Sequence, residues 1–280
     1  MTALVSWIGV DSRGPSSGYI ATDSAISWTR TRGAKTPDVM WKHGQKVFSC
    51  RNQPELFGFC GHVGFPSMVI SQLVELIDRR ILFSDGDSAE SKTEQIVDVL
   101  TRSQKNHPIH CGSWELLSDF TILHLTREKE NMQSRFRVWE HSWSLNRGWT
   151  NVEKEIPTVS KVICAEGSGA ETFLKSNEKW EKSAIGRTSR GIFGAFCDAL
   201  KSGKDPYCGG APQLGGLFRT GNSKQFGIIY NKKRYIAGIE CSSNWQNTNL
   251  EWFNELFERS DPTTLTIKQG AQPQPRPKDI

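Results

Sequence analysis

The chain opens on two apolar runs, Thr2-Ala-Leu-Val-Ser-Trp-Ile-Gly-Val10 and Gly18-Tyr-Ile-Ala-Thr-Asp-Ser24. Residues 11–17 between them are rich in Asp, Ser, Gly and Pro, which are turn-forming residues. This pattern predicts a β-hairpin whose first strand begins at the start of the chain. Because no charged segment and no long apolar segment precedes the hairpin, we expect no leader sequence.

Residue 2 has side-chain chemistry suited to catalysis. An initiator methionine is generally removed before a small residue, and removal of Met1 would leave Thr2 with a free α-amine. Thr2 would then hold a hydroxyl nucleophile and a base together, because an α-amine has a reference pKa of about 8 and is partly neutral near pH 7. Most threonines in this position have no such role, so the hypothesis depends on residues further along the chain.

Composition indicates an ordinary globular protein. The 280 residues are 36% hydrophobic and 23% charged, which suits one large domain or two small ones. The net charge of +5 is dispersed, so we expect neither nucleic acid nor a membrane as a partner, and no apolar run is long enough to span a bilayer. The seven cysteines include no Cys-x-x-Cys pair, which favours a reducing, cytoplasmic location without a disulfide framework. We expect no metal, because His107-Pro-Ile-His110-Cys111 lacks a second ligand pair, and no cofactor.

The apolar spacing predicts an α+β chain. Besides the hairpin, strands are expected over residues 46–50, 56–61, 120–126, 135–140, 161–166, 225–230 and 235–240. Helices are expected over residues 65–83, 89–104, 188–200 and 250–257, and one more after residue 169. The polar composition of residues 27–44 predicts a loop or an irregular hairpin arm. This order predicts two stacked sheets with helix pairs outside, an αββα sandwich in one domain.

Further motifs follow Thr2 in order. They are Asp23-Ser24 at the end of the second run, Lys46-Val47-Phe48, Phe59-Cys60-Gly61-His62-Val63-Gly64, Gly167-Ser168-Gly169 and Asp205-Pro206-Tyr207-Cys208-Gly209-Gly210. The set resembles proteasome β subunits and their bacterial peptidase relatives, which are N-terminal nucleophile hydrolases. Each motif alone is weak, but the ordered set at comparable spacing is a strong signal over about residues 2–241.

The resemblance implies a role for each catalytic position. Thr2 would be the nucleophile of a threonine peptidase, and Lys46 would lie beside it with Asp23 as its buried counter-charge. Gly61 would supply a backbone N–H to the oxyanion. The residues that orient the Thr2 amine would be Ser168, Asp205 and Cys208. Cys208 stands where the family has serine, and a thiol is the weaker hydrogen-bond partner. Without the resemblance, Lys46 and Asp23 would form an ordinary salt bridge, and Ser168 and Asp205 would cap a helix and a turn.

The resemblance also implies the fold and the partners. We expect a four-layer αββα sandwich of the N-terminal nucleophile hydrolase type over residues 2–260 and, from composition, a disordered tail over residues 261–280. The expected substrate is a peptide or unfolded protein that binds as an added strand. The residues expected to contact it are Ile26, Ser27, Phe48, Phe59 and Val63. We also expect a homo-oligomer, as a ring or stacked rings, that could work with an unfoldase or other regulator.

Other functions stay open at this stage. The chain could be a catalytically silent subunit of the same fold, although it keeps the whole catalytic set. It could be an amidohydrolase that acts on a small amide, which would need a closed pocket. A nucleic-acid-binding module is suggested only by the basic charge and the aromatic residues. Cys60 or Cys208 could be a nucleophile paired with His62, but the sequence offers no third member for such a set.

Overall fold

The N-terminal hairpin forms the centre of the first sheet. The computed structural model describes residues 2–30, 34–84, 86–111, 114–115, 117–242 and 250–277. In order across this antiparallel sheet, the strands are β12 (Lys161–Glu166), β1 (Leu4–Asp11), β2 (Gly14–Thr22), β13 (Gln213–Phe218) and β14 (Lys224–Gln225). The predicted hairpin is therefore confirmed, with β1 and β2 paired along their whole length.

The second sheet is also antiparallel. Its strands, in order, are β11 (Gly148–Lys154), β10 (Arg135–Ser144), β9 (Phe120–Glu128), β6 (Glu55–Gly61) and β5 (Val47–Ser49). Side chains of β1, β2 and β13 meet side chains of β6, β9 and β10 in an apolar cluster between the two sheets. The two sheets therefore share one buried interface.

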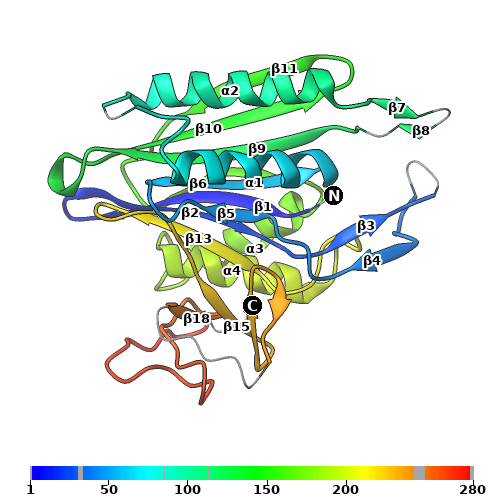
Figure 1. Cartoon of the computed structure of the whole chain (residues 1–280). Helices are drawn as coiled ribbons and strands as arrows, with labels where there is room; N and C mark the ends of the chain where they lie inside the picture. Colours follow the sequence, from blue (N-terminus) through cyan, green and yellow to red (C-terminus); the bar gives the residue numbers. More distant parts are fainter. Residues whose placement is uncertain are drawn as a thin grey trace.

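Two helix pairs cover the outer faces of the sheets, as Figure 1 shows. These helices are α1 (Gly64–Asp78), α2 (Ala89–Asn106), α3 (Ala170–Glu181) and α4 (Ser189–Ser202). Helices α1 and α2 pack on the second sheet through one apolar cluster, and α3 and α4 pack on the first sheet through another. The α+β class is confirmed. No described helix is long and apolar enough to cross a membrane.

The helix predicted over residues 250–257 is absent, and that prediction is wrong. A strand of a third sheet lies there instead. The strands are β17 (Ile239–Glu240), β16 (Lys233–Ile236), β15 (Gly227–Tyr230) and β18 (Trp252–Asn254). β18 pairs in parallel with β15, and the Phe253 ring lies 5.0 Å from that of Phe226 and 4.7 Å from that of Phe257. A short apolar run suits either a helix or a strand, and here tertiary packing selects the strand.

Strand β13 was not predicted, because its Gln-Leu-Gly-Gly-Leu-Phe sequence is typical of a loop. The glycines are required by close packing. A Cβ on Gly215 would lie 2.5 Å from a methyl carbon of Leu56 on the facing sheet. Glycine inside a strand often marks such an approach. β11 was also missed, since much of its surface is exposed.

Two short ribbons and the tail complete the described chain. The ribbons pair β3 (Ile26–Trp28) with β4 (Val39–Trp41) and β7 (His110–Cys111) with β8 (Trp114–Glu115), and η1 (Asn131–Gln133) is a single 3₁₀ turn. In the tail, Arg276 forms an ion pair with Asp198 of α4 at 2.8 Å, and Gln274 is buried. The expected disorder of the tail stays a prediction.

Two buried histidines lie side by side on the second sheet. His124 Nε2 contacts Glu55 Oε2 at 2.7 Å, and His141 Nδ1 contacts Asn151 Oδ1 at 2.8 Å. Burial lowers the pKa of His141 from 6.5 to about 4, because desolvation disfavours the charged ring, and nearby His124 adds to this effect. His141 is therefore neutral in the folded protein near neutral pH.

We expect His141 to make the protein less stable in mild acid. Between about pH 6.5 and pH 4 the unfolded chain binds a proton that the folded protein does not, so the free energy of unfolding falls as the pH is lowered. The loss attributable to this residue should reach about 3 kcal/mol below pH 4. Urea denaturation at several pH values, for wild type and His141→Gln, measures it. Parallel stability curves for the two proteins would contradict the assignment.

Candidate active site

Thr2 lies two residues before Leu4, the first residue of β1, and is fully buried. Its carbonyl oxygen accepts a hydrogen bond of 3.2 Å from Gly169 N. Gly167 has a φ of +85°, and a Cβ at that position would lie only 2.0 Å from Thr2 O. Glycine is thus required both for the backbone conformation and for the close approach. The Gly-Ser-Gly motif therefore holds the start of the first strand in place.

A buried lysine touches the hydroxyl of this threonine. Lys46 Nζ donates to Thr2 Oγ1 at 2.8 Å, to Asp23 Oδ1 at 2.9 Å and to the carbonyl oxygen of Ala25. The side chains of Lys46 and Asp23 are both fully buried. An ammonium group has three N–H donors, and all of them have acceptors here. The structure thus brings together three predicted residues from separate parts of the chain.

The Asp23 carboxylate is held by backbone donors as well as by Lys46. Oδ1 accepts from Ala3 N at 3.2 Å, and Oδ2 accepts from Ala25 N at 3.1 Å and Gly209 N at 3.0 Å. Hydrogen bonds to a charged acceptor are stronger than neutral ones. These contacts compensate the desolvation of the carboxylate and fix its position relative to Thr2.

Gln213 is a site residue that the sequence analysis missed. It lies on β13, is 2% exposed, and its Oε1 accepts from Lys46 N at 3.0 Å. Its Nε2 donates to Gly44 O at 2.7 Å, to Ser24 Oγ at 3.2 Å and to Asp23 O at 3.3 Å. One amide thus joins the backbone that carries Lys46 to the backbone that carries Asp23. No local pattern in the sequence marks this role.

The three predicted orienting residues lie together near the start of β1. Cys208 Sγ lies 3.0 Å from Asp205 Oδ2 and 3.9 Å from Ser168 Oγ. Burial raises the pKa of the Cys208 thiol well above its ordinary value, so the thiol is protonated at neutral pH and can donate to Asp205. Gly209 follows Cys208 directly and bonds Asp23, which links this loop to the charge pair.

An open groove of about 1330 Å³ lies beside the site, and Gly167, which packs against Thr2 O, borders it. Thr2, Asp23 and Lys46 are buried behind this wall and are not among its lining residues. Its walls include Gly61 and Ser168, together with three of the predicted substrate contacts, Ile26, Ser27 and Val63. Gly61 has a φ of +91°, and a Cβ there would lie 2.4 Å from Asp119 O, so only glycine fits at this position.

The structure does not place the other two predicted contacts, Phe48 and Phe59, in the wall of this groove. Phe59 is fully buried in the cluster under helix α1, and its ring lies 6.4 Å from that of Phe48. Phe48 instead borders a separate groove beside α1. The alternation of side chains along a strand explains this, because these residues point toward the helix layer.

The cysteine alternative fits the geometry poorly. Burial raises the pKa of Cys60 to about 12, and the Cys208 thiol is also protonated, whereas a cysteine nucleophile needs thiolate character. His62 Nδ1 lies 3.4 Å from both the backbone nitrogen and the hydroxyl of Ser118. Neither cysteine therefore has the environment of an activated nucleophile.

One group of described residues has ligand atoms close enough together for a metal ion. Glu140, Cys164 and Glu166 bring one ligand atom each within 4.8 Å of one another. Burial and the two carboxylates raise the pKa of the Cys164 thiol well above its ordinary value, and Lys154 Nζ already pairs with Glu140 at 2.8 Å. A protonated thiol and a lysine partner leave this group poorly suited to a cation.

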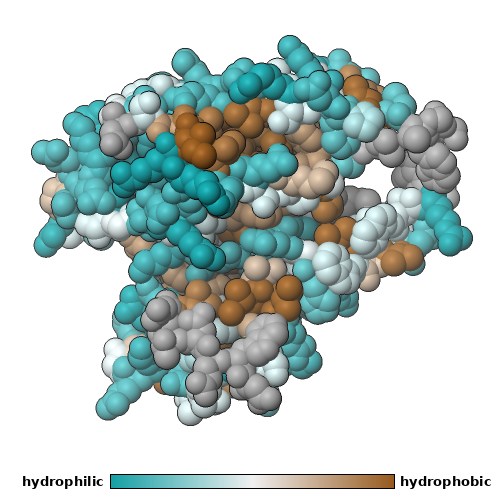
Figure 2. All heavy atoms as spheres, viewed as in Figure 1, coloured by the Kyte–Doolittle hydropathy of each residue, from teal (hydrophilic) through white to brown (hydrophobic). Residues whose placement is uncertain are grey.

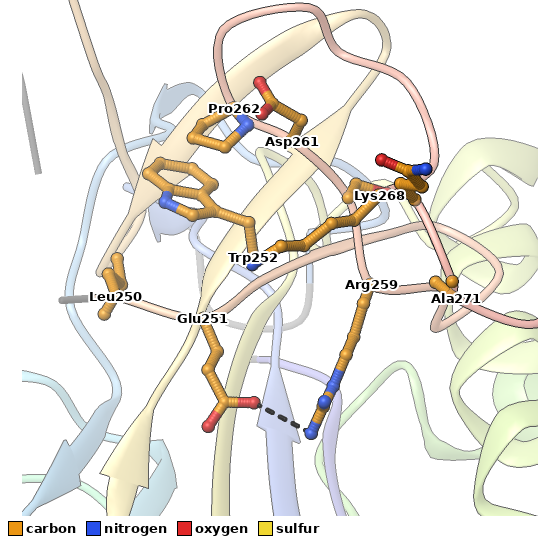
Figure 3. Close-up of a pocket in the computed structure, with 11 residues that line it drawn as sticks. Leu250, Glu251, Trp252, Arg259, Asp261, Pro262, Lys268 and Ala271 are labelled. Carbon is orange, nitrogen blue, oxygen red and sulfur yellow. Dashed lines mark ion pairs between the residues drawn. The ribbon is translucent and has the colours of Figure 1, made fainter. Parts of the chain in front are cut away.

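A second cavity, of about 500 Å³, lies beside β18 (Figure 3). Figure 3 shows the ion pair between Glu251 and Arg259, whose closest atoms are 3.3 Å apart, with Trp252 and Lys268 nearby. None of the residues that line this cavity lines the groove that contains Gly61 and Ser168. It is therefore separate from the candidate active site.

Comparisons with known proteins find a similarity of structure. No family model matches the chain, and no curated protein matches it significantly. Among solved structures, the chain is similar to Thiobacillus denitrificans BPH in complex with epoxomicin, with 14% sequence identity and a TM-score of 0.46. The match covers 78% of this chain and 99% of that chain.

Proposed function

We propose that the protein is a threonine peptidase whose nucleophile is Thr2, exposed by removal of Met1. The observation that carries the proposal is the contact of Lys46 Nζ with Thr2 Oγ1 at 2.8 Å, made while the lysine is held by Asp23. A buried ammonium beside a hydroxyl stabilises the alkoxide as it forms, because the opposite charge lies close by in a medium of low dielectric constant.

The proposed reaction is acyl transfer in two steps. Thr2 Oγ1 attacks the carbonyl carbon of the peptide while its proton passes to the α-amine of Thr2, directly or through one water. The C–N bond then breaks, the leaving amine takes a proton, and an ester joins substrate to Thr2. Water hydrolyses that ester and restores the hydroxyl. The amine would be oriented by Ser168, Asp205 and Cys208, and the N–H of Gly61 would bind the oxyanion.

The substrate would bind as an extended strand along the groove. The backbones of Ser27, Gly61 and Val63 would supply the hydrogen bonds, and the side chains of Ile26 and Val63 the apolar contacts. All of these residues border the groove. Because a charged side chain would be desolvated there, we propose a preference for small or medium apolar residues before the cut. An open groove suits a peptide better than the closed pocket expected for a small amide.

The proposal extends to fold and assembly. The layers formed by the two sheets and the two helix pairs support a four-layer αββα sandwich of the N-terminal nucleophile hydrolase type over residues 2–260. We propose a ring or stacked rings of this cytoplasmic chain, because an open peptidase groove would otherwise cleave other proteins indiscriminately. Helix α1 exposes Met68, and Ile81 beyond its end is 66% exposed; Figure 2 shows apolar residues gathered near α1 and α2.

The test combines mass spectrometry with a covalent inhibitor. The intact mass of the purified protein should lack Met1, and a peptide epoxyketone should form an adduct that maps to Thr2. An epoxyketone suits this purpose because it reacts with a hydroxyl and an adjacent α-amine together. The Thr2→Ala variant, which has the amine without the hydroxyl, is the matched control and should form no such adduct. An adduct on Cys60 or Cys208 with none on Thr2 would overturn the proposal.

A further inference from the structure

The turn between β16 and β17 brings the third sheet up to the candidate active site. Ile236 and Ile239 pair across it, so the turn itself consists of Ala237 and Gly238. Their φ angles are +50° and +85°, and a two-residue hairpin loop with positive φ at both positions matches the twist of its strands. Gly238 O lies 3.2 Å from His43 Nδ1, which ties the turn to the segment that precedes β5.

Gly238 packs against the two acceptor atoms that hold the side-chain nitrogen of Gln213. Gln213 Nε2 donates to Ser24 Oγ at 3.2 Å and to Gly44 O at 2.7 Å. A Cβ on Gly238 would lie 2.8 Å from Ser24 Oγ and 3.1 Å from Gly44 O, so the buried Ser24 side chain would have to move. The turn therefore closes over this hydrogen-bond network, and glycine is required for both its backbone conformation and its close approach.

The network behind the turn carries the buried charge pair. Ser24 directly follows Asp23, and Gly44 lies two residues before Lys46. A displacement of Ser24 or Gly44 therefore reaches each member of the pair through a few backbone bonds. None of the described residues of the third sheet borders the groove beside the site. The turn thus contacts the support of the charge pair and not the path of a bound peptide.

The sheet that presents the turn is itself firmly anchored. Ile228 and Tyr230 of β15 and Phe253 of β18 belong to the apolar cluster that also contains α3 and α4, and Figure 1 shows β15 beside α4. A Cβ on Gly227 would lie 2.4 Å from the ring of Trp252, so β15 and β18 pack closely together. A site held by packed strands is positioned more precisely than a site held by loops.

We propose that Gly238 is a positioning residue, and that the β16–β17 turn keeps Lys46 and Asp23 in place beside Thr2. This inference rests on the proposed peptidase function and adds a part of the third sheet to the support of its site. A lysine moved away from Thr2 would stabilise the developing alkoxide less, so kcat would fall. Because the turn does not border the groove, KM would stay nearly constant.

The experiment compares Gly238→Ala with Gly221→Ala in the hydrolysis of a fluorogenic peptide. Gly221 has a φ of +74°, and a Cβ there would meet nothing within 4 Å, so its variant reproduces the backbone strain without the contact. Gly238→Ala should lose about tenfold or more in kcat, with KM within about twofold of wild type. Gly221→Ala should keep the wild-type kcat. The thermal unfolding midpoint should fall in both variants, which separates stability from positioning.

A double variant tests whether the effect passes through Ser24. Ser24→Gly removes the Oγ and Cβ atoms that a Cβ on residue 238 would meet at 2.8 Å and 3.0 Å. In the Ser24→Gly background, Gly238→Ala should therefore cost less than about threefold in kcat. An undiminished tenfold cost in that background would overturn the route through Ser24.

His43 offers a test that leaves the turn unstrained. Its side chain is exposed, so substitutions there should fold normally. His43→Ala removes the contact with Gly238 O and should lower kcat about threefold at constant KM. His43→Asn should restore kcat, because the asparagine Nδ2 lies close to the position of the histidine Nδ1 and can donate to the same oxygen.

A wild-type kcat in Gly238→Ala would overturn the positioning role, and so would equal losses of kcat in Gly238→Ala and Gly221→Ala. If Gly238→Ala does not fold, a wild-type kcat in His43→Ala overturns it instead. If wild type cleaves the peptide and these variants match it, only the positioning role fails; if wild type cleaves no peptide, the proposed function fails as well.

Discussion

Replacement of Thr2 by alanine is expected to abolish peptide hydrolysis and to leave the fold intact. The variant lacks the hydroxyl that Lys46 contacts at 2.8 Å, and the loss of rate should reach about 10⁴-fold or more, because no acyl-enzyme can form. Few packing atoms are removed, since alanine keeps the Cβ and the backbone. Hydrolysis of a fluorogenic peptide and the thermal unfolding midpoint, measured on the same preparation, test both parts.

Thr2→Ser is the matched control for this variant. Serine keeps the hydroxyl and the α-amine, so it should retain measurable hydrolysis, whereas Thr2→Ala should not. Both variants should be checked by intact mass, because Met1 must be absent from each for the comparison to hold. If Thr2→Ala hydrolysed the peptide at the wild-type rate, another residue would be the nucleophile and the threonine mechanism would be wrong.

Replacement of Lys46 by alanine should lower both the rate and the stability. The Asp23 carboxylate would lose its only described cationic partner while staying fully buried, which costs about 3–5 kcal/mol. Turnover should fall severely, because the alkoxide of Thr2 loses its nearest positive charge. Urea denaturation measures the stability, and peptide hydrolysis at saturating substrate measures kcat.

A double variant separates the electrostatic effect from the chemical one. Lys46→Met with Asp23→Asn removes both charges at nearly constant volume, so it should be more stable than Lys46→Ala and yet remain inactive. This follows because replacing both members of a buried pair is often tolerated, whereas removing one member is not. If Lys46→Ala kept the wild-type rate, the charge pair would be structural only.

Much of the site could be predicted because its members stand in recognisable local patterns. Asp23 ends an apolar run, Lys46 opens the next one, and Gly61 separates a strand from a helix. Asp23 directly follows β2, Lys46 directly precedes β5, and Gly61 ends β6. The buried pair of Lys46 and Asp23 was expected from the resemblance, and the structure contains it.

What could not be predicted depends on contacts between distant segments. Strand β13 looks like a loop until Leu56 of the facing sheet explains its Gly215. Phe59 is apolar, as pocket residues often are, but the direction of its side chain depends on strand register. The structure places it under α1. Gln213 has no local signal at all, because its role exists only through partners more than 160 residues away.

The amide of Gln213 has a mechanical consequence for how such a site can change. Its oxygen accepts from the backbone of Lys46 and its nitrogen donates to the backbone of Asp23, so hydrogen bonds tie these two segments to β13. A shift in any one of them would move the other two, and a lysine displaced by about 1 Å would no longer reach the threonine hydroxyl. Substitutions around this amide should therefore be tolerated only in compensating sets.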